Sequence, residues 1–485
     1  MTSRAVRTPA AVARVSELWP LVIAAALAAL WPLTAYSLHP LLLPALLVVF
    51  LVSVAVLRKP EYGIAVALAL APLTNTVLNA GSGAAIAIPG KPFQLLVPGI
   101  AMGVMVYGAL TLRSEERLGR SRWLTALVLI FVSVGIASSF QALSPSVAVT
   151  KVFALLASAA LFIAVHQICR EREQLVIVAA GAVAGLMIAS AQGLLEQVSG
   201  SFHTFGAGPG GSSVGRVQGS FGHPNAYGGY LAVLLPLAVA FAVSKSFSAQ
   251  LRWLGGVAVA LAVPALILSY SRGAVGALAA GSIIWLALLR PRLALLAAVA
   301  VGVVGLLFAP SAFKDRFSSR ETTADVGLRS DIWSSAIDIY SERPLLGVGL
   351  NNFSVGYSRL PSTLSTGAQR RLLHRSQILV PPHAQNLYLN VLAEEGIIGF
   401  FSLIALAIAA LATIYRGCHV RDPAGRAICM ASGAGIMTLA LHSLLDVTLP
   451  GPIGLPAFAL LAVAAIFVAR DRESLGPNPA VAPRA

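Results

Sequence analysis

Apolar segments of about 20 residues recur along the chain, separated mostly by short polar turns. A helix needs about 20 apolar residues to cross a bilayer, because the segment must satisfy its own backbone hydrogen bonds within the hydrocarbon. The pattern therefore predicts an all-α, polytopic membrane protein with about 14 transmembrane helices. We place the spans at residues 18–37, 40–57, 62–80, 93–112, 123–141, 148–168, 174–195, 225–244, 251–269, 272–289, 293–309, 394–415, 427–446 and 452–469.

Two long polar intervals, 196–224 and 310–393, interrupt this pattern. They divide the chain into four predicted regions. These are an N-terminal membrane region with about seven spans (1–195), a central membrane region with the first outer loop and about four spans (196–309), a large loop (310–393), and a C-terminal membrane region with three spans and a tail (394–485).

The large loop is predicted to be partly helical. In the stretch 329–340, apolar residues recur at helical spacing, namely Ile332, Trp333, Ala336, Ile337 and Tyr340. Such spacing is typical of a helix that lies on a membrane surface or over a site.

Composition supports the membrane interpretation. Hydrophobic residues make up 57% of the chain and charged residues only 11%, and the mean hydropathy is +0.82. Soluble domains carry about 25% charged residues. A surface with so few charges is suited to lipid, so we expect the lipid bilayer to be the chain's main partner.

The 34 Lys and Arg residues are distributed unevenly, and their placement predicts the orientation. Twenty-one lie on alternate loops beginning with the N-terminus, whereas the short loops on the opposite side hold only Lys91, Lys151 and Arg272. Because Lys and Arg concentrate in cytoplasmic loops, we expect both termini to be cytoplasmic and both polar intervals to be periplasmic. The net charge of +15 then reflects topology, and no nucleic-acid partner is predicted.

Two arginines on the predicted outer side are candidates for binding an anion. Arg272 lies at the end of a span, where a charge is costly and is usually paired or functional. A lipid diphosphate would satisfy it, because a guanidinium matches phosphate oxygens bidentately. The alternative is an interfacial side chain that extends to the headgroups. Arg216 is the second candidate, and a solvated loop arginine is its alternative.

Histidines provide the candidates for acid–base chemistry. His383 lies just before the helix that includes Asn386, and it either removes a proton from a hydroxyl at the outer face or caps that helix. His223, followed by Pro224 and Asn225, fits a helix start better than a ligand or base. The His, Cys, Asp and Glu residues show no metal-ligand spacing, and the three Cys are scattered, so neither a metal nor another cofactor is predicted.

Five segments are also informative as a set. They are R-V-Q-G-S-F-G-H-P-N (216–225), S-R-G (271–273), R-S-D-I-W-S-S-A (329–336), P-L-L-G-V-G (344–349) and H-A-Q-N-L-Y-L with E-E-G-I-I-G (383–399). None is specific alone, but in this order they resemble the bacterial O-antigen ligase and polymerase family of membrane glycosyltransferases. The resemblance covers about residues 216–400, and the first half of the chain is similar only as a many-span membrane region.

The resemblance implies a metal-independent, inverting transfer of a glycan from undecaprenyl diphosphate to a sugar hydroxyl at the periplasmic face of the bacterial inner membrane. The acceptor would be the lipid A core for an O-antigen ligase and a glycan for a polysaccharide polymerase. By the same resemblance, Arg216 and Arg272 bind the diphosphate and His383 activates the acceptor. The supporting residues would be Gln385, Asn386, Asn225 and Arg329.

The chain departs from the family's pattern at the position of the catalytic histidine. The pattern has a His directly before an Asn, Ser or Gln, which is followed by nine residues and Gly-x-x-Gly. Here Asn386 and the stretch 396–399 fit, but Gln385 occupies the His position and His383 is the nearest histidine. A protein O-oligosaccharyltransferase of the same superfamily and a polysaccharide or lipid transporter are the alternative functions.

Overall fold

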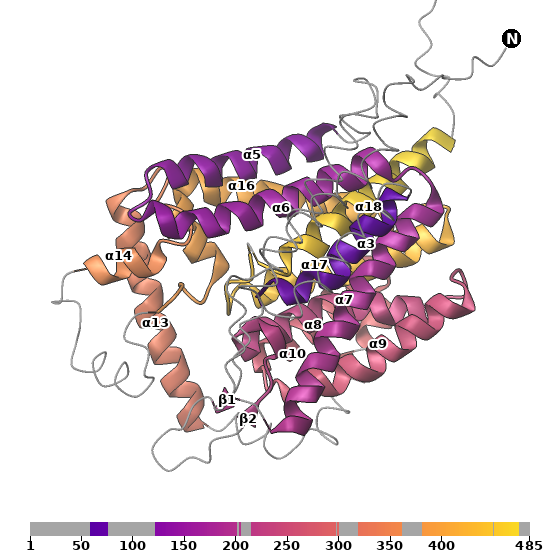
Figure 1. Cartoon of the computed structure of the whole chain (residues 1–485), viewed down its shortest axis with the longest axis horizontal. Helices are drawn as coiled ribbons and strands as arrows, with labels where there is room; N and C mark the ends of the chain where they lie inside the picture. The colour runs from indigo at the N-terminus through magenta and orange to yellow at the C-terminus, as the bar shows by residue number, and fades with distance from the viewer. Residues whose placement is uncertain are drawn as a thin grey trace, which may run out of the picture.

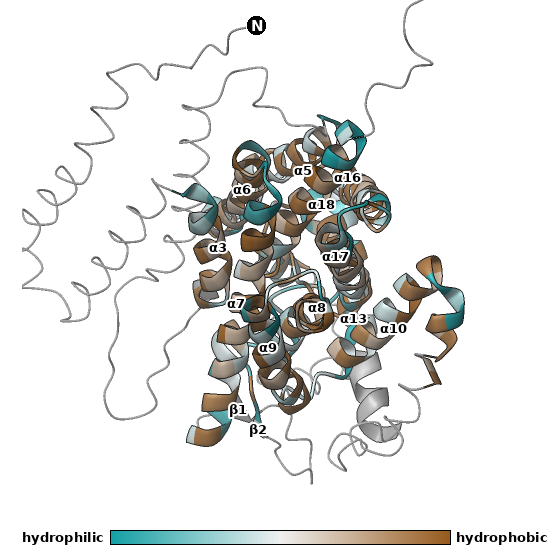
Figure 2. Cartoon of the chain, turned by 90° about the vertical axis from the view of Figure 1, so that its right-hand side faces the viewer, coloured by the Kyte–Doolittle hydropathy of each residue, from teal (hydrophilic) through white to brown (hydrophobic). Residues whose placement is uncertain are grey.

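The computed structural model describes residues 59–75, 122–200, 203–204, 215–296, 298–299, 319–360, 381–449 and 451–474, which form a bundle of long helices (Figure 1). Within this part of the chain, nine helices are long and apolar enough to cross a bilayer. They are α5 (Arg122–Phe140), α6 (Pro145–Ile168), α7 (Arg172–Ser199), α8 (Pro224–Val243), α9 (Ala249–Leu268), α10 (Arg272–Leu289), α16 (Leu387–Gly417), α17 (Pro423–His442) and α18 (Gly454–Ser474). The protein is therefore an all-α, multi-pass membrane protein, as predicted. Figure 2 shows these helices nearly end-on and mostly apolar.

The nine helices correspond to nine of the predicted spans, with ends that differ by a few residues. The polar turn predicted after 251–269 is present, because α9 ends at Leu268 and α10 begins at Arg272. The predicted span 62–80 is described only in its first part, as helix α3 (Pro60–Leu70) and the 3-10 turn η1 (Ala71–Asn75). The predicted spans 18–37, 40–57, 93–112 and most of 293–309 lie outside the described residues.

Strand structure is minor in the described part of the chain. Two-residue strands β1 (His203–Thr204) and β2 (Gly215–Arg216) pair in antiparallel fashion, with His203 opposite Arg216. The short 3-10 helix η3 (Gly219–Phe221) then leads into α8. This arrangement positions Arg216 beside the beginning of α8.

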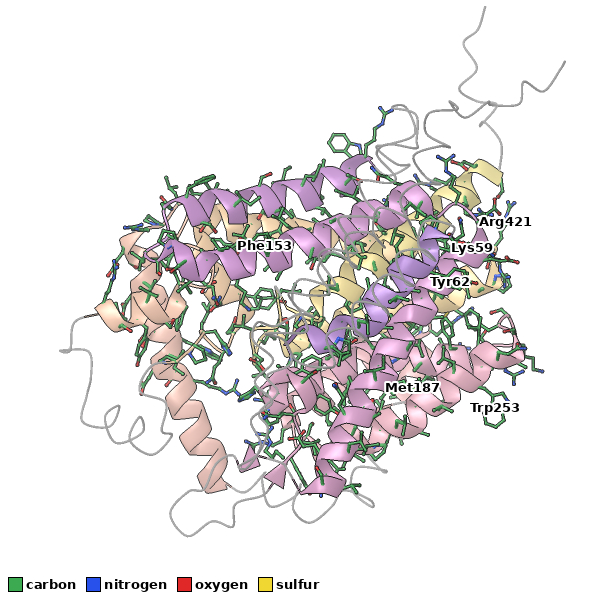
Figure 3. The ribbon with its side chains drawn as sticks, in the orientation of Figure 1. Lys59, Tyr62, Phe153, Met187, Trp253 and Arg421 are labelled. Atoms are coloured by element: carbon green, nitrogen blue, oxygen red, sulfur yellow. The ribbon has the colours of Figure 1, made fainter. Side chains whose placement is uncertain are left out.

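Close helix packing brings several helix ends together. A Cβ at Gly435 of α17 would collide with the Val233 carbonyl oxygen of α8, and a Cβ at Gly281 of α10 would lie 2.6 Å from the Thr438 backbone nitrogen of α17. Small residues let helix backbones approach, which favours helix association in a bilayer. At the helix ends, a Cβ at Gly229 of α8 would lie 2.7 Å from the His442 ring, and a Cβ at Gly273 of α10 would lie 4.0 Å from the same ring, so the N-terminal ends of α8 and α10 meet the C-terminal end of α17. Lys59 and Arg421 lie at the opposite end of the bundle (Figure 3).

Helix α16 is kinked near its beginning, and a loop fits into the kink. Gly396 adopts a left-handed backbone conformation with φ of 69°. The Ile397 N–H donates to the Pro344 carbonyl oxygen over 2.8 Å, and the Val348 N–H donates to the Ala393 carbonyl oxygen over 3.0 Å. The P-L-L-G-V-G segment therefore occupies the position of a missing helical turn.

The predicted helix in the large loop is present, but its buried face differs from the prediction. Helix α13 (Ser319–Glu342) buries Ile332, Ala336 and Ile339, which pack in a cluster that includes Phe353 of the short helix α14 (Phe353–Arg359). Ile337, which was assigned to the apolar face, is 44% exposed. The contacts with α14 and with the segment before α16 decide which face is covered, and helical spacing alone does not specify them.

We predict that Gly396→Ala lowers the stability of the protein. A side chain in this left-handed conformation costs about 1–3 kcal/mol, and a Cβ at this position would collide with the Leu345 carbonyl oxygen. Gly276→Ala is the matched control, because a Cβ at Gly276 of α10 meets nothing within 4 Å. Thermal unfolding of the detergent-solubilised variants should show a lower midpoint for Gly396→Ala alone, and equal midpoints would contradict this account of the kink.

Candidate functional site

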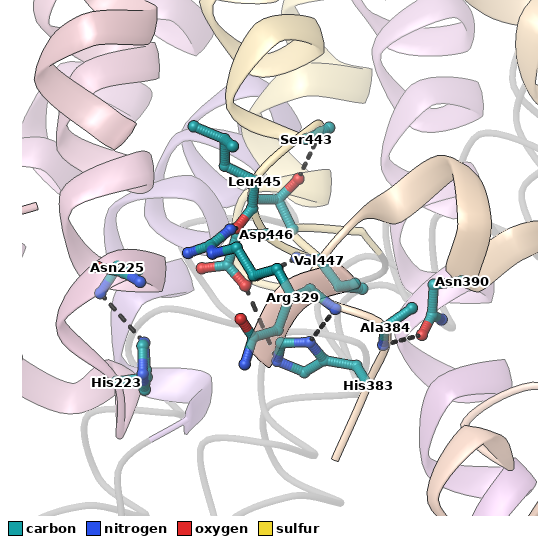
Figure 4. Close-up of polar contacts among 12 residues, drawn as sticks. His223, Asn225, Arg329, His383, Ala384, Asn390, Ser443, Leu445, Asp446 and Val447 are labelled. Atoms are coloured by element: carbon teal, nitrogen blue, oxygen red, sulfur yellow. Dashed lines mark hydrogen bonds and ion pairs between the residues drawn. The ribbon is translucent and has the colours of Figure 1, made fainter. Parts of the chain in front are cut away.

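Polar side chains converge at the end of the bundle where α8, α10 and α16 begin and α17 ends (Figure 4). His383 lies in the segment before α16, and Asp446 lies in the loop between α17 and α18. Arg329 comes from α13 and lies beside both residues. Because these residues come from three separate parts of the chain, tertiary packing is what brings them together.

The imidazole of His383 contacts a backbone amide on one side and a carboxylate on the other. Its Nδ1 accepts the N–H of Gln385 over 3.2 Å, and its Nε2 lies 3.8 Å from Asp446 Oδ1. Burial, followed by the positive charges of Lys151 and other neighbours, lowers the pKa of His383 to about 4. At neutral pH the ring is therefore uncharged. Because Nδ1 accepts a hydrogen bond, the single ring proton of the uncharged imidazole is on Nε2, the nitrogen that faces Asp446.

Asp446 is buried, and only one of its two carboxylate oxygens accepts a hydrogen bond from the described residues. Its carboxylate accepts the Val447 N–H through Oδ1 over 2.8 Å. The other oxygen, Oδ2, is buried and has no hydrogen-bond partner among the described residues. Burial raises the pKa of Asp446 to about 6, although the Val447 amide and the charge of Arg329 act in the opposite direction. A carboxylate with a raised pKa is a stronger proton acceptor than an ordinary one.

Arg329 connects α13 to the loop that carries Asp446. Its Nη1 donates to the Leu445 carbonyl oxygen over 2.6 Å. The charge of Arg329 also contributes to the pKa shifts of His383 and Asp446, so its guanidinium lies close to both. The predicted supporting residue Arg329 is therefore adjacent to the predicted base.

Arg216 is held by neutral acceptors in a buried position. Its Nε donates to the Ser269 carbonyl oxygen and its Nη2 donates to Asn225 Oδ1, each over 2.9 Å. The residue is only 6% exposed. Arg216 thus joins β2 to the start of α8 and to the turn before α10, and Asn225 orients its guanidinium.

Arg272 is the first residue of α10 and is half-buried. The side chain of Ser271 caps the helix by accepting the Ala274 N–H. The following residue, Gly273, faces the Asp446 loop, because a Cβ placed on it would lie 3.3 Å from Leu445. The beginning of α10, where Arg272 lies, is therefore next to Leu445. The Leu445 carbonyl oxygen is the one that accepts the hydrogen bond from Arg329.

Gln385 and Asn386 shape the turn that presents His383. Gln385 has a positive φ of 50°, and Asn386 is the N-cap of α16, since its side-chain oxygen accepts the N–H groups of Tyr388 and Leu389. Asn390 Oδ1 accepts the Ala384 N–H over 3.0 Å. These bonds fix the chain on both sides of His383. All seven sequence-predicted site residues lie at this end of the bundle.

Asp446 was missed by sequence reasoning. The span predicted at 427–446 placed it at a helix end, whereas α17 stops at His442 and Asp446 lies in the following loop. The available signal was an acidic residue next to a short outer loop, but proximity to His383 depends on tertiary structure. In the described residues, no group of three or more His, Cys, Asp and Glu side chains has an arrangement that could hold a metal ion.

The fold and site define a polytopic α-helical membrane protein with a polar centre at one end of its bundle. Residues 257–404 match the model of the family described as O-antigen ligase, and this match supports membership of the chain in the O-antigen ligase family. The matched segment includes Arg272, Arg329 and His383, whereas Arg216 and Asp446 lie outside it. No curated protein matches the chain.

We predict that Arg216→Lys destabilises the protein. A lysine carries one ammonium group and cannot reproduce the fork that binds Ser269 and Asn225, and losing a hydrogen bond to a charged group costs about 1.5–3 kcal/mol. Arg252→Lys, at an exposed position on α9, is the control. Thermal unfolding should separate the two variants. If they unfold at the same temperature, Arg216 does not hold this corner of the fold.

Proposed function

We propose that the protein transfers a glycan from a polyprenyl diphosphate to a sugar hydroxyl, as an O-antigen ligase or polysaccharide polymerase. The family match supports this class of activity in general. The observation that carries the specific proposal is the neutral His383 beside the buried carboxylate of Asp446, at the same end of the bundle as three arginines. A nucleophilic hydroxyl needs a proton acceptor, and a diphosphate leaving group needs positive charge.

Arg216 and Arg272 are assigned to the diphosphate of the donor. Guanidinium groups bind phosphate oxygens bidentately and keep their charge at all relevant pH values. Asn225 and the Ser269 carbonyl oxygen hold Arg216 in a fixed orientation. A preorganised cation of this kind stabilises the charge that develops on the leaving diphosphate without having to reorganise. We therefore assign the leaving-group side of the reaction to the beginnings of α8 and α10.

His383 and Asp446 are assigned to the acceptor. A hydroxyl oxygen between Nε2 and Oδ1, which are 3.8 Å apart, can lie within hydrogen-bond distance of both. In the tautomer that the hydrogen bond from Gln385 favours, the Nε2–H donates to this oxygen, and Asp446 takes the hydroxyl proton as the oxygen attacks the anomeric carbon and the bond to the diphosphate breaks. In the other tautomer, which requires loss of the 3.2 Å bond from Gln385, Nε2 takes the proton and the Asp446 carboxylate stabilises the imidazolium that forms.

The proposed location is the bacterial inner membrane, with both termini in the cytoplasm and the large loop in the periplasm. The uneven distribution of Lys and Arg along the sequence supports this orientation. Lys59 and Arg421 lie at the end of the bundle away from α13 and α14 (Figure 3). The site would then face the periplasm and receive an undecaprenyl-diphosphate-linked glycan, together with a glycan or a lipid A core as acceptor.

We predict that Arg272→Ala abolishes transfer. Removal of one preorganised group that stabilises transition-state charge typically lowers kcat by about 10²–10³-fold, and donor binding should weaken because the diphosphate loses a cation. Transfer of a purified lipid-diphosphate-linked glycan should be measured beside the control Arg252→Ala, which changes an arginine outside the site. Normal donor turnover by the Arg272→Ala protein would show that Arg272 does not bind the diphosphate.

The pH dependence of kcat/KM should distinguish the two proton acceptors. If Asp446 takes the proton, kcat/KM falls as the pH drops through the pKa of Asp446, about 6, because a protonated carboxyl cannot act as a base. If His383 takes the proton, its pKa of about 4 keeps the profile flat well below neutrality. We expect the fall near pH 6 in the wild type and its loss, with a large drop in rate, in Asp446→Asn.

Unchanged activity of Asp446→Asn across the whole pH range would contradict a role for the carboxylate in either arrangement. Asp471→Asn is the matched control, because Asp471 lies near the end of α18, away from the site, and accepts the backbone N–H of Arg421.

A further inference from the structure

A shallow, open cleft of about 550 Å³ lies beside the residue that precedes His383 and is not used by the assignments above. The described residues that line it are Ser354, Val355, Ser358, Arg359 and Pro382. The first four belong to α14, and Pro382 directly precedes His383 in the chain. Adjacent Cα atoms are about 3.8 Å apart, so one wall of the cleft adjoins the histidine.

The cleft lies on the opposite side of the site from the proposed diphosphate arginines. Helix α14 lies at one end of the molecule, beyond α13, whereas α8 and α10 lie on the other side of α13 (Figure 1). Arg216 and Arg272 belong to the beginnings of α8 and α10. In an inverting displacement, the nucleophile approaches the anomeric carbon from the face opposite the leaving group. The position of the cleft therefore suits the acceptor better than the donor.

The cleft carries hydroxyl groups and one cation. Ser354 and Ser358 are four residues apart, so both face the same side of α14. The Ser358 hydroxyl donates to the Ser354 carbonyl oxygen over 2.8 Å, which leaves the lone pairs of its oxygen available to accept hydrogen bonds from a sugar. Arg359 is exposed, and its guanidinium can donate two parallel hydrogen bonds to a phosphate or carboxylate.

We infer that this cleft binds the acceptor, and that the acceptor is a sugar chain carrying an anionic group, a phosphate or a carboxylate, which Arg359 recognises. This inference rests on the proposed function, because the transfer reaction is what requires an acceptor beside His383. Ser354 and Ser358 form hydrogen bonds with the sugar hydroxyls. Arg359 fixes the position of the sugar chain along the cleft, so that one of its hydroxyls reaches the His383–Asp446 pair.

Binding and turnover should be measured separately on the full-length protein in nanodiscs. The probes are an oligosaccharide whose single charged group is a phosphate, the same oligosaccharide after phosphatase treatment, and the same oligosaccharide with one uronic acid in place of the phosphate. Calorimetric titration compares the wild type with Arg359→Gln and with the control Arg252→Gln. Ser354→Leu is a second variant, because it narrows the cleft and removes one of its hydroxyls without changing its charge.

The expected result is that Arg359→Gln weakens binding of an anionic probe about tenfold or more, as expected for a charge-assisted hydrogen bond, while binding of the dephosphorylated probe is unchanged. Dependence on Arg359 for the phosphorylated probe alone identifies a phosphate, and dependence for the uronic-acid probe alone identifies a carboxylate. Ser354→Leu should weaken binding of all three probes. Equal binding of every probe to wild type and Arg359→Gln would overturn the inference.

Turnover separates this inference from the proposed function. In a transferase, Arg359→Gln should raise the KM for the anionic acceptor about tenfold and leave kcat and the KM for the donor unchanged. If the wild type transfers no glycan but loses its affinity for the anionic probe when Arg359 is replaced, the proposed reaction is wrong and the binding site stands. If transfer occurs and the KM for the acceptor is unaffected, the reaction stands and the cleft is not the acceptor site.

Discussion

The carboxylate of Glu394 holds together the part of the structure on which the site depends. It lies inside α16, is 5% exposed, and accepts the backbone N–H groups of Asn351 and Phe353, each over 2.9 Å. A carboxylate in such a position is stable only if hydrogen bonds replace water. These bonds attach the beginning of α14 to α16 just before the kink at Gly396. The large loop is thereby joined to the membrane bundle.

The same attachment determines where α13 lies, and α13 carries Arg329. Ile332, Ala336 and Ile339 of α13 pack in the cluster that contains Phe353 and Ala384. Ala384 is the residue after His383. Packing of the loop, the position of Arg329 and the position of the histidine are therefore parts of one arrangement, and a change in the kink of α16 would move all three relative to Asp446.

Much of this arrangement could be predicted from sequence, because the relevant signals are local or periodic. The apolar segments predicted the spans, and alternation of Lys and Arg predicted that Arg216, Arg272 and His383 share one side of the membrane; the structure brings them to one end of the bundle. The helix at 329–340 was predicted from its spacing. The E-E-G-I-I-G segment begins with Glu394, but its sequence does not show that this residue holds α14.

The remaining features depend on contacts between residues far apart in the chain. Asp446 lies beside His383 because the loop after α17 folds over the beginning of α16, where the Leu387 N–H donates to the Ser443 carbonyl oxygen. The buried face of α13 is set by α14, so Ile337 faced the wrong way in a prediction based on periodicity. The shift of the histidine from the family's position is visible in sequence, but the carboxylate that lies beside its Nε2 could be found only from the structure.

The most direct test of the central claim is transfer from a purified lipid-diphosphate-linked glycan in the presence of EDTA, comparing wild type, His383→Ala and Gln385→Ala. The account predicts that the wild type remains active in EDTA and that His383→Ala loses transfer. Gln385→Ala should keep most of its activity, because the backbone N–H of Gln385, and not its side chain, bonds the His383 ring. Loss of transfer in EDTA, or activity that survives His383→Ala and disappears with Gln385→Ala, would contradict the account.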